Sequence, residues 1–127
     1  MSLDARMRQA LPEAMRARDK AAVRALRTTL AALDNAGAVA VGAAALRGQA
    51  VEESPVGVGA TEVARRELSE KDMVEVVRAE IAERTDAAKE LTGPAHAERA
   101  LALHEEVAVL RRFLDGPDGD EGVGGAR

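Results

Sequence analysis

Residues 69–94 of the chain read SEKDMVEVVRAEIAERTDAAKELTGP, and this stretch decides the fold. Ser69 and Asp72 form the start of a capping box, in which the serine side chain accepts a hydrogen bond from a free backbone N–H of the first helical turn. Apolar residues then recur at helical spacing at Met73, Val77, Ile81, Ala88 and Leu91. Gly93-Pro94 ends this helix and opens the next, since proline suits the first turn of a helix.

A second apolar stripe follows the Gly-Pro turn. Its members repeat at spacings of three and four, and they are Ala100, Leu103, Val107, Leu110 and Leu114. This is an a/d seam of two heptads, which predicts a helix from Pro94 to Leu114. Because the turn between the two helices is tight, they are expected to form an antiparallel hairpin.

Two further helices are predicted before the hairpin, over residues 2–17 and 19–36. Ser2 and Asp19 are suitable N-caps, and Gly37 suits the position that ends the second helix. Pro12 lacks a backbone donor, so it is expected to kink the first helix or to move its start to a later residue.

The remaining segments show no clean period. Residues 37–64 are rich in glycine and small residues, so we expect a long irregular loop, with a short helical turn near residues 43–46. Residues 115–127 offer almost no apolar side chain and are expected to be disordered. The predicted fold is therefore all-α: one helical domain over 1–114, made of about four helices with the 37–64 insertion, and a tail.

Composition excludes several kinds of site. The chain has no Cys, two His and one aromatic residue, Phe113. Disulfides and thiolate metal sites are thus excluded, and a stacking platform for nucleic-acid bases is not expected. No nucleophile–base pair, P-loop or metal-binding motif is present, so we expect no catalytic residues, metal or cofactor, and no catalysis by this chain alone.

No segment indicates a membrane protein. The first residues lack the apolar core of a secretory signal, and the longest apolar run, residues 36–46, is shorter than the ~20 residues of a spanning helix. We therefore expect a cytoplasmic protein without a membrane partner.

The charge distribution is the most informative functional feature. The net charge is −4, yet residues 1–27 carry +4 and residues 28–127 carry −8. We name five of the basic residues the basic corner: Arg16, Arg18, Lys20, Arg24 and Arg27. One interpretation is a surface that contacts nucleic-acid phosphates.

The other interpretation is pairing with acidic residues of the hairpin, which is the commoner fate of charged runs. The expected partners are Glu75, Glu80, Glu83 and Glu90. Arg84 is a separate case, because it lies inside the apolar stripe between Ile81 and Ala88. It must either reach solvent or bind a carboxylate.

Several motifs resemble those of the YqeY family, which shares the GatB/YqeY domain. Residues 14–20 (AMRARDK) with Leu26-Arg27 resemble its signature, residues 67–70 (ELSE) resemble its entry to a long helix, and residues 78–84 (RAEIAER) are similar to the helix itself. Residues 97–114 resemble its closing helix. The resemblance covers about 3–36 and 65–114, and the chain is expected to be a form shortened at the C-terminus.

The resemblance implies an all-helical domain similar to the tail domain of the GatB component of the aspartyl/glutamyl-tRNA amidotransferase. That tail helps to hold tRNA, and the family carries the label of a carbon–nitrogen ligase with glutamine as amido-N-donor. It implies a non-catalytic accessory module whose partner is tRNA or a tRNA-handling protein. The alternative is a module for protein interaction or self-association without a nucleic-acid role, in which the heptad seam of residues 100–114 forms a homo-oligomer.

Overall fold

The structure is a computed structural model that describes the backbone of residues 1–46 and 68–126 and the side chains of 1–39 and 68–116. Its elements are α1 (Leu3–Ala17), α2 (Lys20–Leu46), α5 (Glu70–Glu90), the 3-10 helix η1 (Pro94–His96) and α6 (Ala97–Ala126). Every regular element in these ranges is helical, so the predicted all-α bundle is confirmed.

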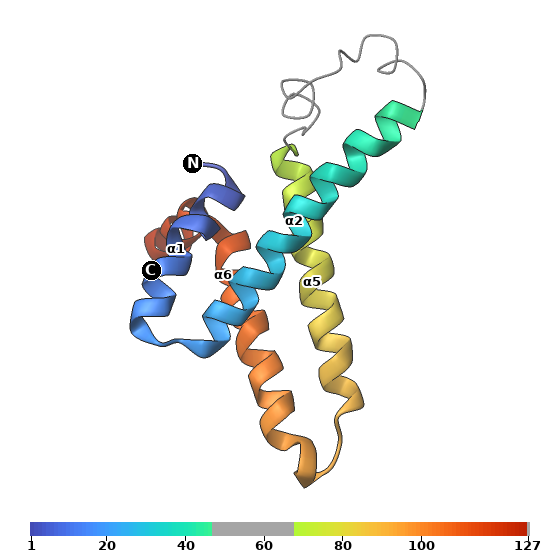
Figure 1. The fold of residues 1–127 in the computed structure, drawn as a ribbon. Coiled ribbons are helices and arrows are strands. Elements are labelled where there is room, and N and C mark those ends of the chain that lie inside the picture. The colour runs from blue at the N-terminus through green and yellow to red at the C-terminus, as the bar shows by residue number, and fades with distance from the viewer. Residues whose placement is uncertain (47–67, 127) are drawn as a thin grey trace.

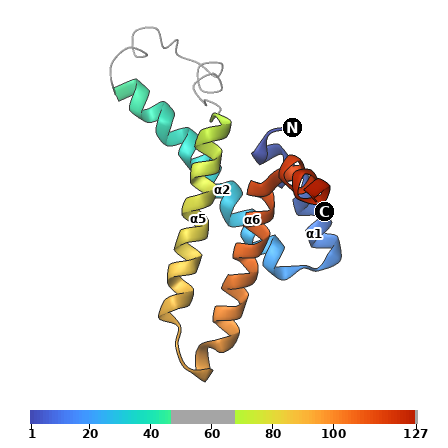
Figure 2. The same ribbon diagram turned by 180° about the vertical axis from the view of Figure 1, so that it is seen from behind.

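The helices form a hairpin covered on one side by the N-terminal pair (Figures 1 and 2). α5 and α6 run antiparallel from the turn at η1, and α2 crosses them both. α1 folds back along α2 and lies beside the C-terminal part of α6. The predicted packing of the first two helices against the hairpin is therefore correct.

The core lies where α1, α2, α5 and α6 meet. Each helix contributes side chains that are almost completely buried, namely Leu3, Met7, Leu26, Val77 and Leu110. Burying a Leu, Val or Met side chain stabilises a fold by about 1.5–3 kcal/mol, so this core is the main source of stability. The predicted stripes of the hairpin contribute Met73, Val77 and Ile81 on one arm and Leu103, Val107 and Leu110 on the other.

Three predicted N-caps are present in the structure. The Ser2 hydroxyl accepts from the Ala5 N–H at 3.3 Å, and the Asp19 carboxylate accepts from the Ala22 N–H at 3.1 Å. The Ser69 hydroxyl accepts from the Asp72 N–H at 3.0 Å. Each satisfies a donor that the first helical turn leaves unpaired, which fixes where the helix begins.

The predicted end of the second helix at Ala36 is wrong, because α2 continues to Leu46. Gly37 is a buried residue within this helix rather than its end, and the predicted loop over 37–64 therefore begins in a helix. Glycine inside a helix costs about 1 kcal/mol relative to alanine, and neighbouring helix-forming alanines offset that cost. Residues 47–64 lie outside the described residues.

Pro12 does not move the start of the first helix, which begins at Leu3 as the Ser2 cap requires. Pro12 is exposed. Because Pro12 has no N–H, the Arg8 carbonyl receives no backbone hydrogen bond in the helix. This carbonyl lies one turn earlier on the same exposed face, where water can donate to it.

The closing helix departs from its predicted bounds at both ends. Its first turn is η1, and the regular helix begins at Ala97. Its helical path is interrupted at Gly116, whose φ of 69° is in the left-handed region that glycine adopts readily. The bounds of α6 then run to Ala126, beyond the predicted end at Leu114. The side chains of residues 117–127, most of the predicted disordered tail, lie outside the described residues.

Replacing Ser69 by Ala tests the cap that starts the hairpin. We expect the free energy of unfolding to fall by about 1 kcal/mol, because the Asp72 N–H loses its acceptor. Urea unfolding followed by circular dichroism measures this change. Ser69→Asp keeps an acceptor oxygen and should remain within a few tenths of a kcal/mol of the original; an equal loss in both variants would contradict a capping role.

Candidate functional site

The basic corner surrounds the turn between α1 and α2. Arg18 occupies this turn with a φ of 57°, and its N–H donates to the Met15 carbonyl at 3.1 Å. The Asp19 N–H donates to the Ala14 carbonyl at 3.0 Å, which closes the C-terminus of α1. All five residues of the basic corner are exposed. The turn therefore presents several cations on a surface built by two helix ends.

The residues of the basic corner differ in their contacts with acidic side chains. Arg24 Nε binds Glu106 Oε2 at 3.3 Å, so its charge is already held by α6. Arg16 makes a long contact of 3.9 Å with Glu13, with both side chains mostly exposed, and such a pair contributes little. Within the described residues no ion pair involves Arg18, Lys20 or Arg27, although Arg27 contacts the Met15 sulfur.

The predicted pairing of this region with Glu75, Glu80, Glu83 and Glu90 is thus wrong in the part of the chain that the structure describes. Glu80 binds Arg84 instead, within α5. Among the described residues, the link from the basic corner to the hairpin is the ion pair of Arg24 with Glu106, on the other arm. The other four cations of the basic corner consequently have no ion pair with the hairpin among the described residues.

Arg84 is the centre of a polar network that joins three helices. Its Nε donates to Glu106 Oε1 at 2.8 Å, and its Nη1 donates to Glu80 Oε1 at 2.8 Å and to the Glu80 carbonyl at 3.0 Å. Its Nη2 donates to the Thr28 hydroxyl of α2. The side chains of Arg84 and Glu106 are only 9% and 5% exposed. The prediction that Arg84 binds a carboxylate is confirmed.

This network keeps Arg84 charged. Burial by itself lowers the pKa of Arg84, but the hydrogen bonds and charges of Glu80 and Glu106 outweigh burial and raise the pKa above its ordinary value. A raised pKa means that the pair's contribution to stability is lost only as the pH rises through that value in strong alkali. Arg84 therefore has no role as a proton donor or acceptor near neutral pH.

Sequence reasoning missed Glu106, although a signal was present. Glu106 follows Leu103 by three residues and precedes Leu110 by four, so it lies on the apolar stripe of α6 as Arg84 lies on that of α5. Opposite charges inside the two facing stripes of a hairpin predict a buried pair, since neither charge tolerates burial alone. Thr29 is also buried, and its hydroxyl has no protein partner among the described residues.

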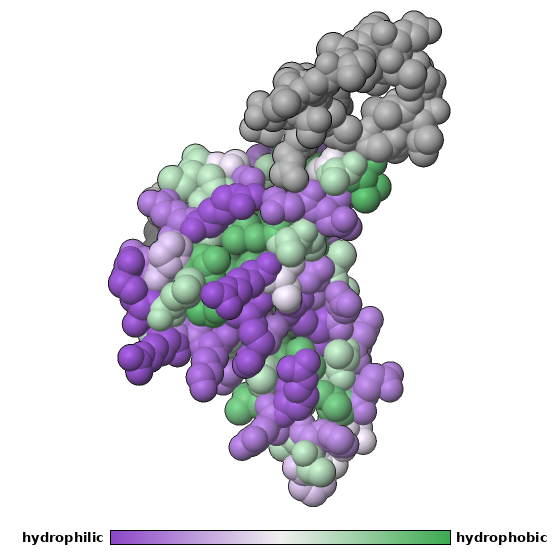
Figure 3. All heavy atoms as spheres, in the orientation of Figure 1, coloured by the Kyte–Doolittle hydropathy of each residue, from purple (hydrophilic) through white to green (hydrophobic). Residues whose placement is uncertain are grey.

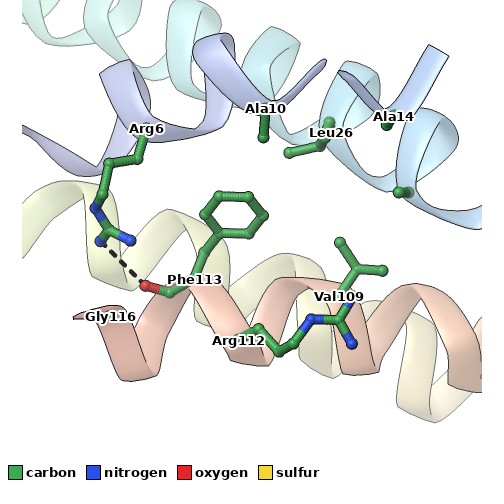
Figure 4. Close-up of a pocket in the computed structure, with 9 residues that line it drawn as sticks. Arg6, Ala10, Ala14, Leu26, Val109, Arg112, Phe113 and Gly116 are labelled. Atoms are coloured by element: carbon green, nitrogen blue, oxygen red, sulfur yellow. Dashed lines mark hydrogen bonds between the residues drawn. The ribbon is translucent and has the colours of Figure 1, made fainter. Parts of the chain in front are cut away.

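An open groove of about 390 Å³ lies between α1 and the C-terminal part of α6, with α2 as its floor. Its lining residues are Arg6, Ala10, Ala14, Ala22, Leu26, Val109, Arg112, Phe113 and Gly116. Arg6 Nη2 donates to the Phe113 carbonyl at 3.1 Å, which joins the two walls at one end (Figure 4). The sequence patterns gave no sign of this groove, because it depends on how α1 meets α6.

One face of the molecule is largely polar (Figure 3). Hydrophilic side chains cover most of the face shown in Figure 3, and apolar residues show between them near α1 and α2. The members Leu103, Val107 and Leu110 of the heptad seam are buried inside the chain. Self-association through this seam would require α6 to lose its contacts with α2 and α5.

The described residues contain no group of three or more His, Asp or Glu side chains that could hold a metal ion. His96 and His104 are both exposed. In the same part of the chain, no helix has the length and apolar character needed to cross a membrane.

No family model matches the chain, and neither a curated protein nor a solved structure matches it.

Replacing Glu106 by Gln tests the central ion pair. We expect a loss of about 3–5 kcal/mol in the free energy of unfolding, because Arg84 would remain buried with half of its charge compensation removed. Denaturant unfolding measures the loss. Retained stability in this variant would contradict the proposed importance of the pair.

A double variant separates the charge from the shape of the side chains. Arg84→Met combined with Glu106→Leu removes both buried charges and keeps an apolar filling. Its stability should exceed that of Glu106→Gln, since no charge remains at the buried centre, and Glu80 and Arg24, which lose their partners, are more exposed than Arg84 and Glu106. Glu83→Gln, an exposed position on the same helix as Arg84, serves as a control and should change stability by less than about 0.5 kcal/mol.

Proposed function

We propose that the chain is a non-catalytic helical accessory module, related to the tail domains of tRNA-dependent amidotransferases, that contacts tRNA phosphates through the basic corner. The observation that carries this proposal is a set of four exposed cations around the α1–α2 turn: Arg16, Arg18, Lys20 and Arg27. Arg24 lies in the same region but has a structural role, because it is bound to Glu106.

Their position supports a phosphate surface. The chain as a whole carries a net charge of −4, so a local excess of cations on it is not a consequence of overall composition. The cations extend from two helix ends that the core holds firmly, since Leu26 of α2 and Met7 of α1 are buried. Cations on a rigid frame lose less entropy when they bind a polyanion than cations on a free tail.

The type of contact follows from the residues present. Arginine and lysine bind phosphate oxygens and position a nucleic acid, whereas sequence is read by contacts to bases. Residues 14–28, which carry the basic corner, include no aromatic residue, Asn or Gln. The basic corner is therefore suited to backbone contacts with a folded RNA rather than to reading a sequence.

The family label of glutamine-dependent carbon–nitrogen ligase belongs, in this proposal, to a complete enzyme and not to the chain alone. Among the described residues, the buried charged groups are engaged in the network of Arg84, Glu80 and Glu106. Such a network fixes helix packing and supplies no nucleophile. The partner is then tRNA itself or a tRNA-handling protein.

The alternative of a self-association module is less well supported. The seam on which it depends is packed against α2 and α5. The exposed large apolar residues of the described part of the chain are separate from one another in sequence, and they are Met1, Met15, Val39 and Leu101. Scattered single apolar residues are normal on a protein surface and do not mark an interface.

Charge reversal at the basic corner tests the proposal. The variant replaces Arg16, Arg18, Lys20 and Arg27 by Glu and leaves Arg24 in place, so that the contact with Glu106 survives. Binding of bulk tRNA is measured by fluorescence anisotropy at several salt concentrations. We expect the unmodified chain to show a steep salt dependence, and the variant to bind at least about tenfold more weakly with a flatter slope, since each phosphate contact contributes about 0.7–0.9 to that slope.

A matched control carries the same net charge on another surface. Lys71, Arg78, Lys89 and Arg99 are exposed residues of α5 and α6, and their replacement by Glu should leave most of the tRNA affinity intact. Equal losses in the two variants would show that net charge alone governs binding. Absence of tRNA binding by the unmodified chain at low salt would overturn the proposal.

A further inference from the structure

We propose that the groove between α1 and α6 is a binding site for a small amphipathic anion, a short alkyl or aryl group that carries one carboxylate or a similar acid. The inference is independent of the tRNA proposal. It rests on the shape of the groove, its apolar floor and the identity of its charged residues.

The groove exists because the residues between its walls are small. Ala10 and Ala14 are one turn apart on α1, and Ala22 of α2 also lines the groove. Opposite them, Val109 and Phe113 are one turn apart on α6, and Phe113 is only half-buried although it is the single aromatic residue of the chain. Figure 4 shows its ring between the two walls. An apolar group placed there would cover surface that the fold leaves partly exposed.

The charges of the groove have one sign. Arg6 and Arg112 are its charged lining residues, and no acidic residue lines it among the described residues. One N–H of Arg6 donates a hydrogen bond to the Phe113 carbonyl, and neither arginine has an ion pair in the described part of the chain. Two guanidinium groups beside an apolar floor favour a ligand with an acid at one end and an apolar body.

The size of the groove favours a small molecule over a protein partner. Its volume of about 390 Å³ falls in the range of small-ligand sites, which hold a few polar groups at the edge of an apolar pocket. A stable protein interface needs about 1,200 Å² or more of buried surface, far more than this groove offers. Arg112 would bind the acid, since one N–H of Arg6 is already bound to the Phe113 carbonyl on the other side of the ring (Figure 4), and Ala10, Leu26 and Val109 would hold the apolar body.

Octanoate is a suitable probe because it has this chemistry and no other group. Titration is followed by two-dimensional ¹H–¹⁵N NMR of the full chain, with octanol as the uncharged match and octylammonium as the cationic match. We expect octanoate to shift the amide signals of Ala10, Ala14 and Phe113 and to bind at least fivefold more tightly than either match. Equal binding of the three probes, or shifts confined to other residues, would overturn the proposal.

Variants locate the site. Arg112→Gln should weaken octanoate binding about fivefold, which is a modest loss because the side chain is exposed. Arg111→Gln is the matched control: it removes the same charge from the neighbouring exposed position, which does not line the groove, and should leave binding unchanged. Equal effects of the two substitutions would show that the response is to net charge and would overturn the site.

Filling the groove gives a second measure that does not depend on charge. Ala14→Leu places a larger side chain in the groove and should abolish octanoate binding while the spectrum of the folded chain is retained. If this variant does not fold, Ala10→Val fills less space and should still weaken binding several-fold.

Vesicles of anionic phospholipid distinguish a membrane surface from a free acid: binding to vesicles without binding of monomeric octanoate would overturn the proposal.

Discussion

The ion pair between Arg84 and Glu106 is the constraint on which the rest of the structure depends. Both groups lie inside apolar stripes, so each would carry a large desolvation cost without the other. The Glu106 carboxylate uses one oxygen for Arg84 and the other for Arg24, and Arg84 also reaches Thr28. One acidic residue thus sets the register of α5, α6 and α2 together. Leucine, valine and alanine contacts alone would permit neighbouring registers, since they are not directional.

This arrangement also determines which surface cations are available for binding. Arg24 is bound to Glu106, while Lys20 and Arg27 of the same helix are exposed and have no ion pair among the described residues. α1 is attached by different contacts: Arg8 binds Asp34 of α2 at 2.8 Å, and the Leu3 N–H donates to the Glu70 side chain at 3.1 Å. The end of α1 near Arg6 is therefore fixed to α5 and α6. That attachment leaves a groove beside it rather than a closed packing of α1 on α6.

Local patterns in the sequence were enough to predict most of the fold. Ser69 and the Gly93-Pro94 turn were reliable because caps and prolines act through the backbone nearby. The end of α2 was not predictable from Gly37, since burial and alanine neighbours decide whether a helix passes a glycine. Glu106 and the groove depend on contacts between helices far apart in the chain. The residues of the basic corner were accordingly predictable from the sequence. The ion pair that binds Arg24 of this corner to Glu106 became clear only from the tertiary contacts.

The network of Arg84 also indicates the order in which parts of the chain fold. Arg84 and Glu106 are 22 residues apart, on the two arms of one hairpin, whereas Arg24 and Glu106 are 82 residues apart. Contacts at short separation form faster because less chain entropy is lost in closing the loop between them. The hairpin is thus expected to form the pair of Arg84 with Glu106 first. The second oxygen of Glu106 then gains Arg24 when α2 docks. Weakening the hairpin pair should slow folding, whereas weakening the Arg24 contact should chiefly hasten unfolding.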